Sequence, residues 1–420
     1  MLFDEGASRR PRASATEAAV NSSAADLARW VPRLLAVFRG IRGDGAGRRA
    51  RRPPSDRLSP DELEEVARAV RRLSQGLTRD RALAGERYLD DPRLLGAYLL
   101  FYWPTSYLQA RSVLSELVTR PLVVLDLGSG PGAVAFAALD AGASEVVAAD
   151  RSARALAAAR SLATAAGRPL ATRGWDPSRQ TSLARLAGGR SFDLVAFGHV
   201  VNELFAGENA PERRAALLAA AAALLRPGGS ALAIEPALRE TSRKLLAVRD
   251  RLVAEGFTVR APCLFRGPCP ALVRETDWCH AERAIEPPPM VADIARAAGL
   301  RREAVKMSYL VLAPRDEGWA PPPRGRVFRI VSEPLPSKGR LRYMGCGPEG
   351  RLGLALQEKD VTDRNRAFER LLRGDVVELT EVEPRGDGLR LSGTSEVRVV
   401  ARAGEPLRGH GPGPPGTGSS

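Results

Sequence analysis

The sequence predicts an α/β protein built on a parallel, doubly wound sheet, with a helical domain before it and a small β domain after it. Strand-like and helix-like runs alternate between residues 119 and 316, which is typical of βα units. A Gly-rich turn, LDLGSGPG, follows the first of these strands. Beyond residue 323, apolar and polar residues alternate in short runs with a turn at Asp387-Gly388, which indicates a small barrel or sandwich.

The first 118 residues predict two segments. Residues 1–57 are rich in Ala, Ser and Arg, so we expect a basic, flexible arm, although residues 24–38 have the apolar spacing of a helix. Ser59 and Glu62 form the pattern of a capping box. They predict the start of a helical domain over residues 58–118 that packs against the sheet.

The sheet domain is expected over residues 119–316. Each predicted strand is a short, mainly apolar run, and the runs are 121–128, 145–150, 169–176, 191–200, 230–238, 257–262 and 307–314. An insertion over 262–306 separates the last two strands. The β domain is expected over 323–402, and the Gly- and Pro-rich tail, 403–420, predicts disorder.

Composition limits the class of partner and compartment. The chain has 63 Lys and Arg against 49 Asp and Glu, a net charge of +14, which favours a polyanionic partner such as nucleic acid. It contains no uninterrupted apolar run of membrane-spanning length, and its start lacks the apolar region of a secretory signal. Its 4 cysteines are too few for a disulfide framework and favour metal binding, catalysis or burial.

A nucleotide site is predicted at the end of the first strand. Asp126, Gly128, Gly130 and Gly132 form a D-x-G-x-G-x-G pattern between a strand and a helix, where glycines allow close approach of a ligand. Asp150 ends the second strand, where an acid can accept hydrogen bonds from ribose hydroxyls. A dinucleotide site is the alternative, because a relaxed G-x-G-x-x-A pattern is also present.

The acid two residues before the first glycine resembles motif I of class I S-adenosylmethionine (SAM) methyltransferases, which favours SAM over a dinucleotide. This resemblance implies that Asp176 contacts the adenine amino group. Asn202, in GHVVNELF after the fourth strand, is a candidate ligand or substrate contact at the same sheet edge. His199 and Glu235 lie at that edge as well, and no catalytic residue is assigned.

The four cysteines fall in two Pro- or Gly-rich segments. Cys263, Cys269 and Cys279 lie in one stretch of the insertion, and Cys346 lies in the β domain. Their spacing matches neither a zinc ribbon nor a ferredoxin, so four thiolates leave Zn²⁺ and an iron–sulfur cluster open. His280 is an alternative ligand. Ligation by all four thiols would bind the β domain to the sheet domain.

These motifs together resemble the methyltransferase-like proteins of the mitochondrial small ribosomal subunit and their bacterial relatives. The resemblance covers about 88–375 and includes LDLGSGPG, FDLVAFGHVVNEL, AIEP, PCLFRGPCPAL, DWCH, KMSYLVL and CGPEGRL. It implies a SAM-binding fold and a four-cysteine iron–sulfur cluster, of the 4Fe–4S type, held by Cys263, Cys269, Cys279 and Cys346. The chain departs from the family pattern at Arg373, where a Trp is usual.

The same resemblance implies a function in small-subunit assembly or translation through contact with ribosomal RNA. A monomer on the subunit is expected, in a bacterial cytoplasm or, in a eukaryote, in the mitochondrial matrix. An active rRNA methyltransferase and a structural zinc protein are the alternatives. Phosphate contacts are expected from basic residues of the β domain, with Phe328 and Tyr343 available to stack on bases; the basic residues are Arg324, Arg326, Arg329, Lys338, Arg340 and Arg342.

Overall fold

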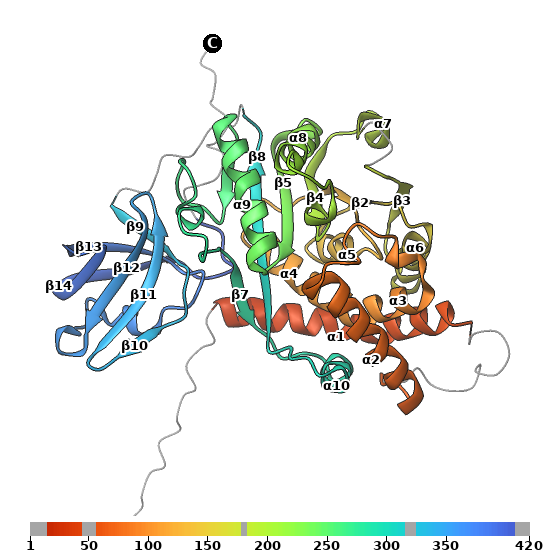
Figure 1. Ribbon diagram of the computed structural model, residues 1–420, viewed down its shortest axis with the longest axis horizontal. Helices are drawn as coiled ribbons and strands as arrows, with labels where there is room; N and C mark the ends of the chain where they lie inside the picture. The colour runs from red at the N-terminus through yellow and green to blue at the C-terminus, as the bar shows by residue number, and fades with distance from the viewer. Residues whose placement is uncertain (1–14, 44–55, 178–182, 316–324, 408–420) are drawn as a thin grey trace, which may run out of the picture.

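The computed structural model describes residues 15–43, 56–177, 183–315 and 325–407, so parts of the expected arm, most of the expected tail and Arg324 lie outside it. The N-terminal part is helical (Figure 1). Its elements are α1 (Ala15–Ile41), α2 (Pro60–Ser74), η1 (Gln75–Arg79), η2 (Tyr88–Asp90), α3 (Pro92–Ala97), η3 (Tyr98–Tyr102) and α4 (Trp103–Leu114). The predicted capping box is present, since Glu62 N donates to Ser59 Oγ and Ser59 N donates to Glu62 Oε2.

Helix α1 differs from the flexible arm expected over residues 1–57. Leu34, Leu35 and Phe38 are buried in the same apolar core as α2, α4 and α5. The Trp30 ring adds a hydrogen bond, from Nε1 to Asp140 Oδ2 at 2.8 Å. The helical spacing of residues 24–38 therefore describes this segment better than its composition does.

The central sheet has the strand order β3-β2-β1-β4-β5-β8-β6, with β7 paired to β8 (Figure 1). The first five strands run parallel, and β8 is antiparallel to β5, β6 and β7. This is the doubly wound, Rossmann-like order of class I methyltransferases, and the predicted fold class is confirmed. The strands are β1 (Val123–Leu127), β2 (Glu145–Asp150), β3 (Ala171–Gly174), β4 (Phe192–Gly198), β5 (Leu225–Pro236), β6 (Thr258–Ala261), β7 (Ala281–Ala284) and β8 (Ala304–Ala313).

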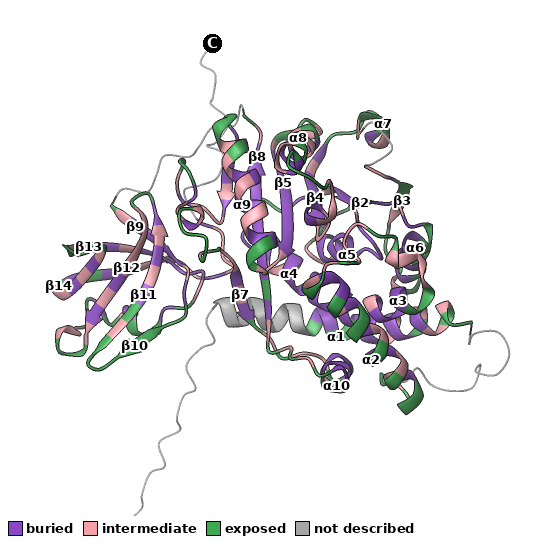
Figure 2. Ribbon diagram, viewed as in Figure 1, coloured by how far each residue is buried: buried purple, intermediate pink, exposed green. Residues whose placement is uncertain are grey.

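Helices cover both faces of the sheet, and Figure 2 shows its strands mostly buried. Because side chains alternate along a strand, Val124 packs on the face of the N-terminal helices and Leu125 on the opposite face. The remaining helices are α5 (Ala133–Asp140), α6 (Ala153–Ala166), α7 (Leu183–Ala187), η4 (Val201–Glu203), α8 (Ala210–Ala222), α9 (Arg239–Ala254), η5 (Pro270–Leu272) and α10 (Pro289–Ala298). None of the described helices is long and apolar enough to cross a membrane.

The C-terminal domain is a second sheet, of order β10-β11-β12-β14-β13-β9, which closes because β9 also pairs with β11. The predicted hairpin is present, with Arg385 paired to Gly388 around the turn. The elements are β9 (Arg326–Ile330), β10 (Leu335–Ser337), β11 (Arg340–Gly347), β12 (Gly350–Gln357), η7 (Glu358–Asp360), η8 (Arg366–Arg370), β13 (Val376–Arg385) and β14 (Gly388–Ala401).

Three of the residues expected to contact RNA in this domain are buried. Phe328 and Tyr343 lie in the barrel core with about 1% or less of their surface exposed, so the expected base stacking is wrong. Arg329 is also buried, and its Nη1 lies 3.5 Å from Glu116 Oε2. Arg326 lies near Glu349, whereas Lys338, Arg340 and Arg342 are exposed.

The barrel and the sheet domain share a buried polar contact. Glu116, which follows α4, accepts a hydrogen bond from Tyr309 Oη of β8 at 2.7 Å and one from Arg283 Nη2 of β7 at 3.2 Å. Arg329 reaches the same carboxylate from β9. An apolar cluster that includes Leu264 and Val327 packs beside it. The two domains are therefore joined by packing as well as by chain connection.

Candidate nucleotide and thiol sites

The Gly-rich turn after β1 has a backbone conformation that would let a ligand approach it closely. Gly128, Gly130 and Gly132 have φ values of 72°, 52° and 87°, in the region that favours glycine. A Cβ on Gly128 would lie 2.5 Å from the side chain of Val200. The turn thus leads from β1 into α5 in close contact with Val200.

Two buried carboxylates accept hydrogen bonds from the backbone of this turn and of the helices that follow β1 and β2. Asp150 Oδ2 accepts from Gly130 N at 2.8 Å, and its Oδ1 accepts from Ser152 N at 2.7 Å. Asp126 Oδ2 accepts from Ala135 N at 3.0 Å, whereas its buried Oδ1 has no hydrogen-bond partner among the described residues. Burial raises the pKa of Asp126 to about 7.

A cavity of about 70 Å³ opens at this turn, and Gly128, Gly130 and Asp150 line it. The segment 85–89 covers it, because Arg151 Nη2 donates to Gly85 O at 2.8 Å. Tyr88 of this segment donates to Glu203 across the cavity at 3.4 Å. No sequence signal predicts that this segment covers the cavity, since it lies before the sheet domain and carries no nucleotide-binding motif.

Other predicted site residues lie beside the cavity rather than on it. Gly132 caps the N-terminus of α5, and Asp176 lies 3.9 Å from Arg87 next to the lining residue Trp175. The side chain of Asn202 is occupied by protein partners: its Nδ2 donates to Glu235, and its Oδ1 accepts from Arg81.

His199 lines the cavity but is held as a structural histidine. Gln109 Nε2 donates to Lys306 O, so Gln109 Oε1 is the acceptor that faces His199 Nε2 at 2.7 Å. His199 Nε2 therefore carries the proton. Burial lowers the pKa of His199 to about 4, so the ring is neutral at physiological pH.

All four cysteines line a second cavity, of about 60 Å³, between the sheet domain and the barrel. Cys263, Cys269 and Cys279 come from the loops between β6 and β7, and Cys346 comes from β11. Backbone contacts with α9 hold two of them. Cys269 N donates to both oxygens of Asp250 at 3.0 and 2.9 Å, and Cys279 N donates to Ser242 Oγ at 3.2 Å.

The thiol cavity is lined by cationic side chains. Arg283, Arg329, Arg351 and Arg373 contribute to its wall. The Nε atoms of the first three are buried and have no hydrogen-bond partner in the described part of the chain. No sequence motif predicts this lining, because the four arginines come from distant segments.

Burial disfavours the charged form of two of the thiols. Burial raises the pKa of Cys269 to about 12 and that of Cys279 to about 11, so both are protonated at neutral pH without a bound cation. No three His, Cys, Asp or Glu side chains of the described residues are grouped so that they could hold a single metal ion.

The profile of the family described as "Mitochondrial small ribosomal subunit Rsm22" matches residues 94–387. The chain belongs to this family. The resemblance inferred from the motifs is thereby confirmed, and the iron–sulfur site that it implies stays a prediction. No curated protein matches the chain.

Solved structures with a similar fold include several methyltransferases. TrmN from Thermus thermophilus is 21% identical, with 51% of this chain and 53% of that chain covered and a TM-score of 0.32. An O-methyltransferase family protein from Burkholderia thailandensis is 19% identical, with 61% and 73% covered and a TM-score of 0.32. A methyltransferase from Pyrococcus furiosus is 13% identical, with 50% and 83% covered and a TM-score of 0.32.

Proposed function

We propose that this Rsm22-family chain is a SAM-binding, iron–sulfur-containing, methyltransferase-like factor that acts on small-subunit ribosomal RNA in ribosome assembly or translation. One observation carries the proposal: four thiols from two domains line one cavity walled by arginines, in a chain of a small-subunit family. Its place of action is the mitochondrial matrix in a eukaryote and the cytoplasm in a bacterium.

The residues at the Gly-rich turn fit SAM. Asp150 directs its carboxylate to the turn and keeps lone pairs for ribose hydroxyls, and Asp126 holds the start of α5 by accepting from Ala135 N. A side chain at Gly128 would clash with Val200, which also lines the cavity, so only glycine keeps the turn in this position. Bound SAM supplies an electrophilic methyl group, and these residues hold and orient the nucleoside part.

The donor set of the second cavity, four thiols from two domains, suits an iron–sulfur cluster or zinc, and the family resemblance favours the cluster. A thiolate-ligated cluster spreads its four cysteines around a larger, anionic core. The buried Nε atoms of Arg283, Arg329 and Arg351 are suitable donors to such an anion.

The surroundings of the first cavity favour a binding role over methyl transfer. Asn202, expected near the acceptor, is bonded to Glu235 and Arg81, and His199 is bonded to Gln109. General base catalysis needs a group that can reach the acceptor and take its proton. These two polar candidates are engaged elsewhere, so the proposal does not require turnover.

Anaerobic purification followed by iron, sulfide and zinc analysis tests the cluster. We expect brown protein with iron and sulfide in equal amounts, and colourless protein with stoichiometric zinc would overturn this part of the proposal.

Calorimetry with SAM tests the nucleotide site, with Asp150→Ala expected to weaken SAM binding at least about tenfold. Co-sedimentation with small subunits tests the partner, and no association would contradict it.

A further inference from the structure

The C-terminal barrel has the topology of an oligonucleotide-binding (OB) fold. Its closed strand order is β9-β11-β12-β14-β13-β9, and all pairings are antiparallel except β12 with β14. In chain order, with β10 taken as the bent continuation of β9, this is the 1-2-3-5-4-1 order of a five-stranded Greek-key barrel. OB folds bind strands across the face of their second and third strands, which here are β11 and β12.

The outward positions of these two strands carry basic and small residues. The strand register pairs Arg340 with Gln357, Arg342 with Ala355 and Met344 with Gly353. The intervening residues, such as Tyr343 and Leu354, point into the core. The outward positions therefore form one continuous face, which we call the β11–β12 face, and none of them is acidic.

The charge of the barrel is unevenly distributed. Arg340 and Arg342, together with Lys338 in the adjoining hairpin, are exposed and form no ion pair with any described carboxylate. On β13, by contrast, Glu381 and Glu383 occupy exposed positions, whereas Glu378 is ion-paired with Arg398. A polyanion is thus attracted to the β11–β12 face and repelled from β13.

The middle of the β11–β12 face is open. A Cβ built on Gly353 would have no heavy atom within 4 Å, and φ there is not in the left-handed region. Gly353 and Ala355 thus leave the backbone of β12 accessible to a strand laid across it. Such a strand contacts the sheet chiefly through phosphate and sugar, since the aromatic rings of this domain are in its core.

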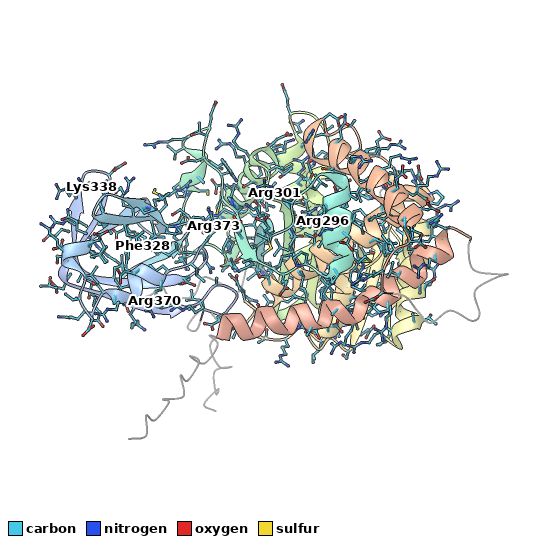
Figure 3. All side chains as sticks on the ribbon, turned by 90° about the horizontal axis from the view of Figure 1, so that it is seen from below. Arg296, Arg301, Phe328, Lys338, Arg370 and Arg373 are labelled. Carbon is cyan, nitrogen blue, oxygen red and sulfur yellow. The ribbon has the colours of Figure 1, made fainter. Side chains whose placement is uncertain are left out.

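One end of the β11–β12 face meets the thiol cavity. Cys346 pairs with Arg351 there, and Arg351 lies 3.3 Å from Asp277 of the sheet domain. Trp278, next to Asp277, is 37% exposed and provides an aromatic surface at that end. Figure 3 shows Lys338 far out on the barrel and Arg373 where the barrel meets the sheet domain, so the face runs away from the junction.

We infer that the β11–β12 face binds single-stranded RNA, with Lys338, Arg340 and Arg342 on phosphates and Trp278 stacking a base at the inner end. This inference rests on the proposed RNA partner and specifies the surface and the form of the RNA. Strand β11 is about 26 Å long at the usual rise per residue. The footprint is therefore at the low end of the roughly 4–16 nucleotides that OB folds bind.

Fluorescence anisotropy of the purified full chain with a labelled single-stranded uridine oligonucleotide of about 12 nucleotides tests the inference. Gly353→Glu adds a carboxylate to the open centre and is expected to weaken binding at least about tenfold. The double variant Arg340→Glu/Arg342→Glu is expected to do the same and to flatten the dependence of affinity on salt. The control is Arg366→Glu, on η8 outside the face, which changes the net charge by as much as either Arg340→Glu or Arg342→Glu alone. Its affinity for the oligonucleotide is expected to stay within about twofold of wild type.

Iron content, SAM binding and thermal unfolding are measured on every variant. If the two face variants bind the oligonucleotide as wild type does, or if a duplex of equal length outcompetes it, the inference is overturned while the proposed function stands. If wild-type protein lacks both SAM binding and iron, the proposed function fails independently. Equal weakening by Arg366→Glu shows attraction by net charge alone and also overturns the inference.

Discussion

Glu235 shows how a single buried acid can be recognised by its pH dependence. It is fully buried at the end of β5, where it accepts from Asn202 N at 3.2 Å and from Asn202 Nδ2. Burial raises its pKa to about 8, above the ordinary value of 4.5. The folded protein therefore holds a proton on Glu235 at neutral pH that the unfolded chain has released.

The sign of the effect follows from linkage. The folded state binds the proton more tightly, so the contribution of Glu235 to stability is full below its unfolded pKa and is lost as pH rises towards 8. In this window it should lower the free energy of unfolding by about 1.4 kcal/mol per pH unit. We expect Glu235→Gln to remove this slope, measured by denaturant unfolding between pH 5 and 8 as the difference from wild type. An unchanged slope would contradict the assignment.

Gly128 allows a second prediction at the same scale. Gly128→Ala combines a positive φ with a 2.5 Å approach to Val200, so it should lower stability by more than the roughly 1–2 kcal/mol of a left-handed alanine and should abolish SAM binding. Gly167→Ala is the matched control, because Gly167 has φ 60° and no atom near its Cβ. Calorimetry and thermal unfolding compare them, and equal losses of SAM affinity would argue against the nucleotide site.

For individual residues, the sequence predicted the backbone position of the Gly-rich turn better than it predicted side-chain contacts. Gly128 and Gly130 of the D-x-G-x-G-x-G pattern line one cavity with Asp150, because the ends of neighbouring parallel strands meet at one edge of the sheet. That these residues bind SAM stays a prediction. The partner of Asn202 could not be predicted. It depends on Arg81, from a segment more than a hundred residues earlier whose path over the sheet is set by tertiary packing.

Among the elements, the segment 85–89 is the part most open to test. It closes over the Gly-rich turn and is held by hydrogen bonds from Arg151 to Gly85 O and Glu86 O, at 2.8 and 2.5 Å. The cavity beneath holds about 70 Å³, well below the roughly 300 Å³ usual for small-molecule sites. A nucleoside-sized ligand therefore requires this segment to move outward.

We expect Arg151→Ala to speed amide hydrogen exchange in 85–89 and to increase both the association and dissociation rates of SAM. Loss of the two hydrogen bonds lowers the cost of opening by about 1–3 kcal/mol. Arg154→Ala, at an exposed position of α6, is the control and should leave exchange and rates unchanged. Slower association in Arg151→Ala would show that the segment helps to recruit the ligand rather than to cover it.

The boundaries of elements were predictable from the sequence wherever apolar runs were long. Which face of a strand is buried was not always predictable. The sheet strands overlap the expected runs, since a buried parallel strand needs an apolar run on both faces, except β7, which lies in the predicted insertion and was not expected. Phe328 and Tyr343 were expected to face outward, yet alternation places them in the core. Period-2 alternation defines two faces, and without the register of neighbouring strands it does not say which one meets solvent.

For the whole molecule, the junction of sheet domain and barrel combines two kinds of link. One is the Glu116 carboxylate with Arg283, Arg329 and Tyr309, and the other is the cavity to which Cys346 brings the only thiol of the barrel. From the sequence, we expected the four cysteines to lie close together. The sequence could not predict Glu116, because an acid after an amphipathic helix ordinarily faces solvent.

Removing either link should have a different signature. Cys346→Ser should lower iron content as strongly as Cys279→Ser, and it should lower the Tm, because metal binding contributes folding free energy. Glu116→Gln should leave the iron in place but destabilise the junction, since Arg283 and Arg329 lose a buried counter-charge, at a cost of about 3–5 kcal/mol. Iron analysis and calorimetric unfolding of both single variants and the double variant measure these effects.

Because both links stabilise one interface, the double variant should lose less unfolding free energy than the sum of the losses in the single variants. Full iron content and an unchanged Tm in Cys346→Ser would show that the barrel thiol holds no metal.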